Sequence, residues 1–190
     1  MKSISFLSAT VAALSAPSYA DEFTPALESF YQNHIAEMAT NQAIIDAVNS
    51  QNTATAGYSL ADIEALDKAW RAEVGTSNTP TISPVLDNTT SAMLREQVSE
   101  FGGQITEIFI MDAQGLNVAA SSVTSDYWQG DEAKHSETYG VGPDALHISE
   151  IELDESTQRY QGQISFPVVD PSTGQPIGAI TVGVDAQSLL

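Results

Sequence analysis

The segment GGQITEIFIMDAQGLNVAAS, residues 102–121, marks the change from predicted helix to predicted strand in this chain. After the two glycines, apolar residues change from a helical spacing of three and four to a β-branched and aromatic run over residues 105–112. Asp-Ala-Gln-Gly, residues 112–115, is typical of a turn, and residues 117–121 return as the second strand of a hairpin. The pattern therefore predicts helices before Gly103 and strands after it.

Upstream, one long amphipathic helix is predicted from Thr24 to about Thr55. Thr24 is a candidate N-cap, Pro25 suits the first helical position, and Gly57 ends the segment. The apolar stripe consists of Leu27, Phe30, Tyr31, Ile35, Met38, Ile45 and Val48. This stripe predicts a helix packed on the sheet, and the helix is also a candidate seam for a homodimer.

Two further helices follow. Ser59 begins the first of them, in a capping-box pattern with Asp62, and Gly75 ends it. After a polar loop over residues 75–84, another helix is expected over residues 87–101, stopped by Gly102 and Gly103.

Three more strands are predicted downstream, beyond a long connection over residues 122–147. They cover residues 148–153, 158–169 and 177–185. The expected architecture is α+β, with a five-stranded antiparallel sheet whose strands follow one another in sequence order, and with the helices packed on it.

Residues 1–20 have the layout of a secretory signal peptide. Lys2 precedes an apolar run over residues 4–16, and small residues stand at Ser18 and Ala20. The run is too short to cross a bilayer. We therefore expect cleavage after Ala20, a periplasmic location, and one soluble domain over residues 21–190 that is stabilised without any disulfide, because the chain has no Cys.

The charge of the chain excludes nucleic acid as a partner. Six Lys and Arg stand against 25 Asp and Glu, a formal net charge of -19. Binding to a phosphate backbone needs clustered cationic side chains, which such a chain does not supply. The acidic surface favours solubility, and a cation or a basic partner as its counterpart.

Signatures of catalysis are missing from the sequence. There is no Cys, no Gly-x-Ser-x-Gly elbow and no phosphate-binding loop, and only three His are present. We expect no enzymatic activity, no catalytic residue and no cofactor.

Three segments together resemble a known family. They are GGQITEIFIMDAQGLNVA through TSDYWQGDEAK (residues 102–134), FPVVDP (residues 166–171) and IGAITVGVD (residues 177–185). This sequence resembles the extracytoplasmic Cache (PDC) sensor domains over nearly the whole of residues 21–190.

The resemblance implies a PAS-like sheet, a long N-terminal helix, and a small-molecule pocket between the sheet and the insertion over residues 122–147. Most such domains lie between two membrane helices of a histidine kinase, chemoreceptor or cyclic-nucleotide enzyme. Here a cleavable signal takes the place of the first anchor and Leu190 ends the chain. We therefore expect a separate membrane protein, a histidine kinase or chemoreceptor, as the signalling partner.

The candidate ligand-binding residues lie mainly in the insertion. Tyr127 and Trp128 are large aromatics in a polar loop, as binding-site walls often are. Lys134 suits an anionic ligand group, and Tyr139 is a weaker candidate. Asp170, at the end of a strand, either accepts hydrogen bonds from a ligand or caps its own turn.

Asp131 is the remaining candidate. It shares a face with His135 on a predicted short helix, a pair that supports either ligand binding or a metal ion. Two ligands do not make a metal site, so we predict none.

Three functions fit these features. The first is a periplasmic sensor that binds a small molecule and modulates a membrane signalling protein. The alternatives are a soluble binding or scavenging protein without a signalling partner, and a sensor of divalent cations.

Overall fold

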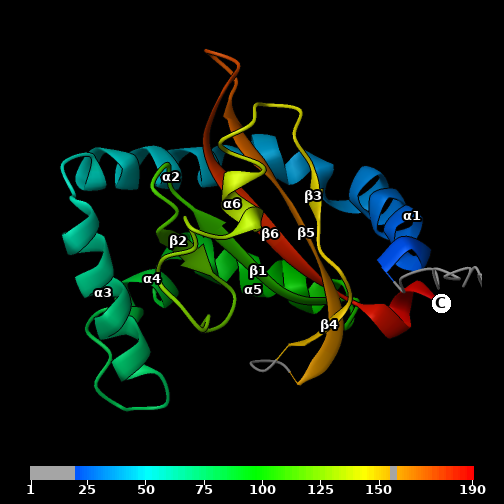
Figure 1. Cartoon of the computed structure of the whole chain (residues 1–190), viewed down its shortest axis with the longest axis horizontal. Coiled ribbons are helices and arrows are strands. Elements are labelled where there is room, and N and C mark those ends of the chain that lie inside the picture. The colour runs from blue at the N-terminus through cyan, green and yellow to red at the C-terminus, as the bar shows by residue number, and fades with distance from the viewer. Residues whose placement is uncertain (1–19, 155–157) are drawn as a thin grey trace, which may run out of the picture.

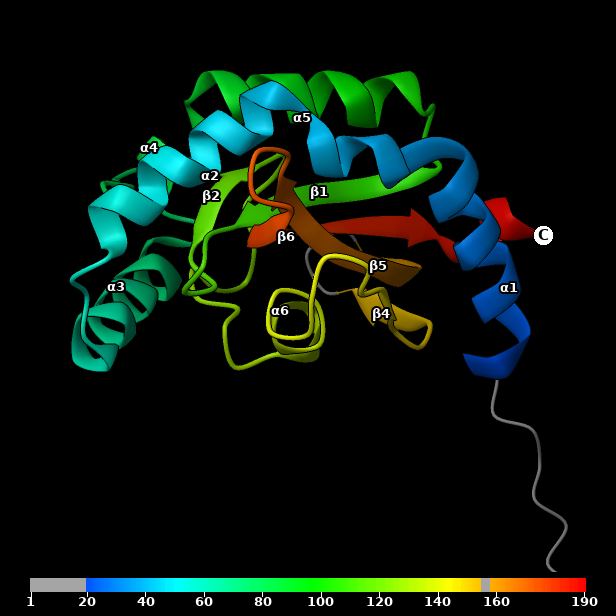
Figure 2. The same ribbon diagram turned by 90° about the horizontal axis from the view of Figure 1, so that it is seen from above.

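The computed structural model of the chain describes residues 20–154 and 158–190. One twisted antiparallel sheet divides the molecule into two layers. Helices α1 (Ala20–Phe30), α2 (Gln42–Thr55) and α5 (Thr89–Glu100) lie along one face of the sheet, and α6 (Ala133–Ser136) with the segment around it lies on the other (Figure 2). The α+β class is confirmed.

The sheet has six strands in the order β2-β1-β6-β5-β3, with β4 also pairing with β5. Their bounds are β1 Ile105–Met111, β2 Asn117–Ala120, β3 His147–Ile148, β4 Glu152–Asp154, β5 Arg159–Asp170 and β6 Gln175–Asp185. All pairs are antiparallel.

The prediction that neighbouring strands of the sheet follow one another in sequence is wrong at one place. The last strand, β6, lies between β1 and β5, so that β6 is central (Figure 1). Both β1 and β6 are buried along almost their whole length, and strands covered on both faces belong at the centre of a sheet. The predicted strand 148–153 is divided into β3 and β4, which pair with successive parts of the long strand β5.

The long N-terminal helix is interrupted. It consists of α1 Ala20–Phe30, a π-helical turn Tyr31–Ile35, a 3-10 turn Ala36–Thr40, and α2 Gln42–Thr55. Asn41 has extended backbone angles, and its side chain accepts a hydrogen bond from the Ala43 N–H, so Asn41 is the N-cap of α2.

The predicted start of this helix is also wrong. Helix α1 begins at Ala20, so Thr24 and Pro25 lie inside it. Residues 1–19, and with them nearly all of the expected signal peptide, lie outside the described residues.

The other helices follow the sequence closely. Helix α3, Leu60–Glu73, begins with the predicted Ser59–Asp62 capping box, and Gly75 follows it with a φ of 77°. Helix α5 spans Thr89–Glu100 and ends before two positive-φ glycines. Two short helices were not predicted as separate elements: α4, Ile82–Leu86, begins in the predicted loop over residues 75–84, and α6, Ala133–Ser136, lies in the insertion over residues 122–147. A 3-10 turn, Ala186–Leu189, follows β6.

Alternation along the strands gives the two faces of the sheet different characters. One face is apolar and packs against α1, α2 and α5; its strand residues include Ile108, Ile110, Ile164, Phe166, Ile180 and Val182. On the other face a smaller cluster gathers Phe109, Met111 and Ala179 with Trp70 of α3. Beside this cluster the second face becomes polar, and a cavity opens there.

Among the described residues, no helix combines the length and the hydrophobicity needed to cross a membrane.

Candidate functional site

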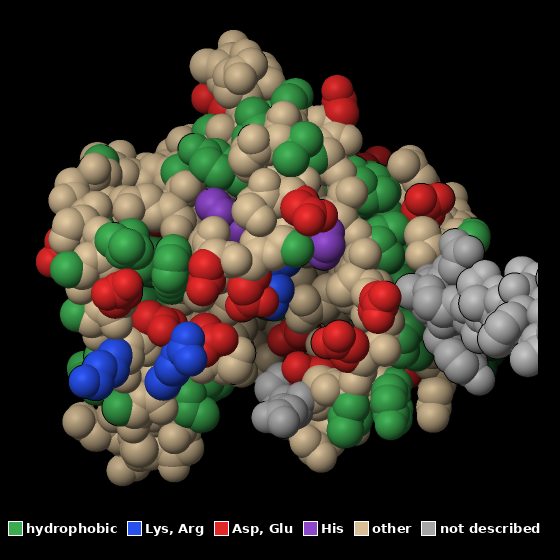
Figure 3. All heavy atoms as spheres, viewed as in Figure 1, with side chains coloured by type: hydrophobic (Ala, Val, Ile, Leu, Met, Phe, Trp, Pro, Cys, Tyr) green, Lys and Arg blue, Asp and Glu red, His purple; other side chains and the backbone are tan. Residues whose placement is uncertain are grey.

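A cavity of about 390 Å³ lies between the polar part of the sheet and the segment that follows β2. Its floor comes from β1 and β5, one wall from β3, β4 and their connection, and its cover from residues 124–134. In the view of Figure 3, acidic side chains gather around a hollow at the centre of this face. The volume falls within the range of small-molecule sites.

The lining residues are mostly polar or charged. They are Glu107, Phe109, Thr124, Ser125, Gln129, Glu132, Ala133, Lys134, His147, Ser149, Glu152, Leu153, Asp154, Gln161 and Gln163.

Glu107 is the buried acid of the floor. It is only 4% exposed, and its Oε1 accepts hydrogen bonds from the side-chain amides of Gln161 (2.8 Å) and Gln163 (3.1 Å). Burial first, and then the charge of Asp154, raise the pKa of Glu107 above its ordinary value, against the opposing effect of the two amides and Lys134.

Gly183 of β6 makes room for this arrangement. A Cβ at that position would come within 2.9 Å of Glu107 Cγ and 2.8 Å of Gln161 Oε1. Only glycine therefore lets the side chains of β1 and β5 meet across the central strand.

Lys134 covers the cavity from α6. Its ammonium pairs with Glu132 at 2.9 Å, donates to Gln129 Oε1 at 3.2 Å, and lies 5.5 Å from the centre of the Phe109 ring. The side chain is largely buried, so these partners fix it in place.

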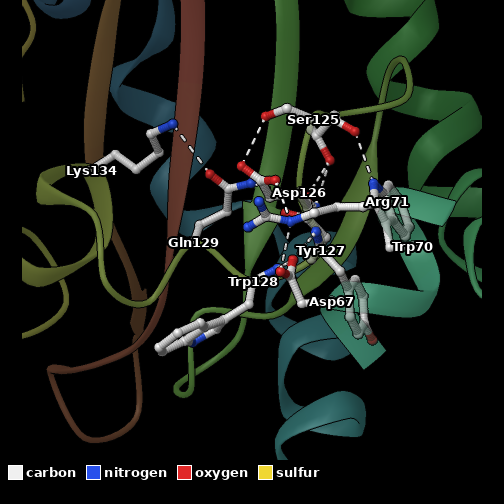
Figure 4. A network of polar contacts seen from close by, with 11 residues as sticks. Asp67, Trp70, Arg71, Ser125, Asp126, Tyr127, Trp128, Gln129 and Lys134 are labelled. Atoms are coloured by element: carbon white, nitrogen blue, oxygen red, sulfur yellow. Dashed lines mark hydrogen bonds and ion pairs between the residues drawn. The ribbon is translucent and has the colours of Figure 1, made fainter. Parts of the chain in front are cut away.

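A clasp from α3 holds the covering segment (Figure 4). Asp67 is 8% exposed, and its Oδ1 accepts from the backbone N–H groups of Tyr127 (2.9 Å) and Trp128 (3.1 Å). Arg71 bridges Asp67 to Asp126 with contacts of 2.8 and 2.9 Å. We call Asp67, Arg71 and Asp126 the α3 clasp.

The two predicted aromatic residues belong to this attachment and do not line the cavity. The ring of Tyr127 stacks on Trp70 at 5.4 Å, and burial, followed by the charge of Asp112, raises the pKa of Tyr127 to about 12. Trp128 donates its indole N–H to the Gln114 carbonyl, in the β1–β2 turn, at 2.8 Å. A direct contact of either with a ligand stays a prediction.

The predicted helical pair of Asp131 and His135 is not present. Helix α6 starts at Ala133, so Asp131 precedes it and is exposed. His135 is buried instead, stacked on Tyr139 at 5.1 Å with a ring nitrogen 3.1 Å from the Asp112 carbonyl. Burial lowers the pKa of His135. Tyr139 packs in the smaller core cluster.

Asp170 lies at the β5–β6 turn and outside the cavity lining. Its carboxylate accepts from the backbone N–H and the hydroxyl of Ser172, at 2.8 and 2.7 Å, and these bonds lower the pKa of Asp170. The geometry is that of the turn cap, one of its two predicted roles. The expected meeting of Asp170 with Tyr127 and Trp128 is not observed, because the turn extends beyond the edge of the site.

Of the six predicted ligand-binding residues, the structure therefore places only Lys134 in the cavity lining. Four residues of the site were not predicted from the sequence: Glu107, Gln161, Gln163 and Asp67. A signal was present for the first three, because polar residues alternate with apolar ones in strands that are otherwise buried. Asp67 gave no signal, since a carboxylate on a helix is normally solvated.

No family model and no curated protein matches the chain. Solved structures do. The chain is similar to the sensor domain of the V. cholerae histidine kinase DctB, with 14% identity, a TM-score of 0.46, and coverage of 90% of this chain and 57% of that one. It is also similar to the sensory domain of the Campylobacter jejuni chemoreceptor Tlp3 with isoleucine bound, with 15% identity, a TM-score of 0.42, and coverage of 87% and 63%.

A third similar structure is an extracellular ligand binding receptor from Desulfohalobium retbaense, with 16% identity, a TM-score of 0.38, and coverage of 77% of this chain and 25% of that one. The chain thus spans less than two thirds of each of these solved chains. They include sensor domains of a histidine kinase and a chemoreceptor.

Proposed function

We propose that the protein is a sensor module that binds a small polar molecule in the cavity between β1, β5 and the covering segment. The observation that carries this proposal is the cavity itself, which has a suitable volume and a buried carboxylate held in place by two amides. Sites for small molecules typically combine such a concavity with a few placed polar groups.

The way the cavity is closed supports a sensor. Residues 124–134 supply its cover, and the α3 clasp fastens the same segment to a helix on the outside of the molecule. A ligand that contacts the cover therefore favours one position of the segment over others, and this preference reaches α3 through Asp67 and Arg71.

The signalling partner is a membrane protein, a histidine kinase or a chemoreceptor, and the site of action is the periplasm. The sequence resemblance and the expected signal peptide support this part of the proposal. Free of ligand and partner, the module is expected to be a stable domain in its own right.

Ligand binding is tested by thermal denaturation of the purified protein with a panel of amino acids, amines, carboxylates and sugars, and with Ca²⁺ and Mg²⁺. A compound that binds the native state raises the melting temperature by an amount that grows with the ratio of its concentration to its Kd, and calorimetry then gives that Kd. If no compound in the panel raises the melting temperature, the sensor proposal fails. If only the divalent ions do, the cation-sensor alternative replaces it.

The partner is tested by cross-linking in cells and pull-down from the membrane fraction. Recovery of a histidine kinase or chemoreceptor, with a signalling output that changes when the gene is deleted, supports a sensor. A ligand that binds while deletion changes no output identifies a scavenging protein.

A further inference from the structure

We propose that the cavity selects an organic ammonium cation, whose charged nitrogen pairs with the free oxygen of Glu107. This inference rests on the proposed function and names the chemical class of its ligand.

Glu107 offers an acceptor to the cavity. The Gln161 and Gln163 amides both donate to Oε1, and no described residue donates to Oε2. None of the described Lys, Arg or His side chains forms an ion pair with this carboxylate. Lys134 acts on Glu107 only from a distance, because its ammonium pairs with Glu132. A buried carboxylate costs free energy when no cation contacts it, and a ligand ammonium would supply that contact.

The orientation of the amides favours a charged carboxylate. The Gln161 carbonyl oxygen accepts a hydrogen bond from the Thr106 hydroxyl, which directs the Gln161 NH₂ group toward Glu107. Two N–H donors on one oxygen stabilise the ionised form and hold it in one position. The site is therefore organised for a cation before the ligand arrives.

The remaining charges of the lining select against anions. Glu132, Glu152 and Asp154 add negative charge around the cavity, and the Lys134 ammonium is already paired with Glu132 and hydrogen-bonded to Gln129. The Glu132–Lys134 pair has no net charge, so a ligand carboxylate would meet the negative charges of Glu107, Glu152 and Asp154. Electrostatic complementarity of this kind works against the wrong charge as much as it favours the right one.

The walls indicate an organic cation. Phe109 and Leu153 provide apolar surface for a hydrocarbon body. Among the described residues, no three His, Asp or Glu side chains converge in a way that would hold a metal ion, whereas Ca²⁺ takes six to eight oxygen ligands. A volume of about 390 Å³ also exceeds what a bare ion fills.

The test is calorimetry on the purified protein at pH 7.5 with four probes of similar size: butylamine, 1,4-diaminobutane, 1-butanol and butanoate, with CaCl₂ as a fifth. We expect the two amines to bind and the other three not to bind. Glu107→Gln keeps the size of the side chain and removes its charge, so amine affinity should fall about tenfold or more. Glu96→Gln, an exposed acid on α5 against the opposite face, should leave it unchanged.

The unsubstituted protein gives a second readout. Protonation of Glu107 removes its pairing with an ammonium, so amine affinity should fall as the pH is lowered through the raised pKa of Glu107. This measurement keeps the inference testable if Glu107→Gln does not fold.

Binding of butanoate or 1-butanol as tight as that of the amines, with no effect of Glu107→Gln, would overturn the choice of a cation and leave the proposed function standing. Binding of CaCl₂ alone would overturn both the organic ligand and the sensor of small molecules. No binding by any probe overturns the cation inference, and the wider panel then decides whether the proposed function also falls.

Discussion

Asp67 shows how much one buried side chain contributes to the site. Its carboxylate satisfies two backbone N–H groups of the covering segment and one N–H of Arg71. Without it these donors would be left in a partly buried place, where an unmade hydrogen bond costs about 1–3 kcal/mol. Asp67 is thus a positioning residue for the cover of the cavity.

Asp67→Ala is therefore expected to lower the free energy of unfolding by about 2 kcal/mol and to weaken ligand binding. Urea denaturation and calorimetry measure the two effects. Asp67→Asn, which keeps one acceptor oxygen, should recover part of both losses. Glu64→Ala, at an exposed position of the same helix, serves as the control. A variant as stable as the unsubstituted protein would show that the clasp does not hold the segment.

Glu107 is proposed to favour ligand binding, but it lowers the stability of the ligand-free protein at high pH. Its pKa in the folded protein is raised above the unfolded value, so the folded state binds the proton more tightly than the unfolded state. The contribution of Glu107 to stability is fully present below the unfolded pKa and is lost as the pH rises through the folded pKa.

Without ligand, Glu107→Gln should accordingly gain stability relative to the unsubstituted protein as the pH is raised from 4 to 8. Denaturation in urea at several pH values gives the difference. A difference that stays constant over this range would contradict the raised pKa. The same substitution is expected to weaken amine binding. Glu107 would then be a residue that is kept for function at a cost in stability.

The break in the N-terminal helix is caused by one polar residue, Asn41. The apolar stripe continues on both sides of Asn41, and Ile35, Met38, Ile44 and Val48 all join the same core cluster. The Asn41 side chain offers the backbone an acceptor that competes with the next helical turn, and the chain restarts as α2.

Asn41→Ala should remove this N-cap and lower the free energy of unfolding by about 1 kcal/mol. Asn49→Ala, at an exposed position within α2, should have a smaller effect because it removes no cap. Chemical denaturation of both variants makes the comparison. Equal stability of Asn41→Ala and the unsubstituted protein would mean that α1 and α2 simply merge into one helix.

The expected signal peptide should be removed on export. Protein exported to a periplasm should begin at Asp21 and unfold in one cooperative transition as a single domain over residues 21–190. Intact mass spectrometry and calorimetric unfolding check the two parts. Recovery of a chain that still begins at Met1 in the membrane fraction would contradict the signal peptide.

Features that depend on neighbouring residues could be predicted from the amino-acid sequence. The Ser59–Asp62 capping box, the glycine stops after α3 and α5, and the hairpin over residues 105–121 are all local, because they depend on hydrogen bonds and backbone angles within a few positions. The same local patterns fixed the α+β class, since helical spacing gives way to alternation at Gly103.

Where these elements meet depends on long-range packing and could not be predicted from the sequence. The placement of β6 beside β1 brings Glu107 between Gln161 and Gln163, residues that lie more than fifty positions away. Lys134 could be selected from the sequence because it lies in the insertion, but its place above Phe109 depends on how the insertion folds back on the sheet. Periodicity shows which face of a strand is buried and not which strand lies beside it, so the composition of the cavity follows from long-range packing.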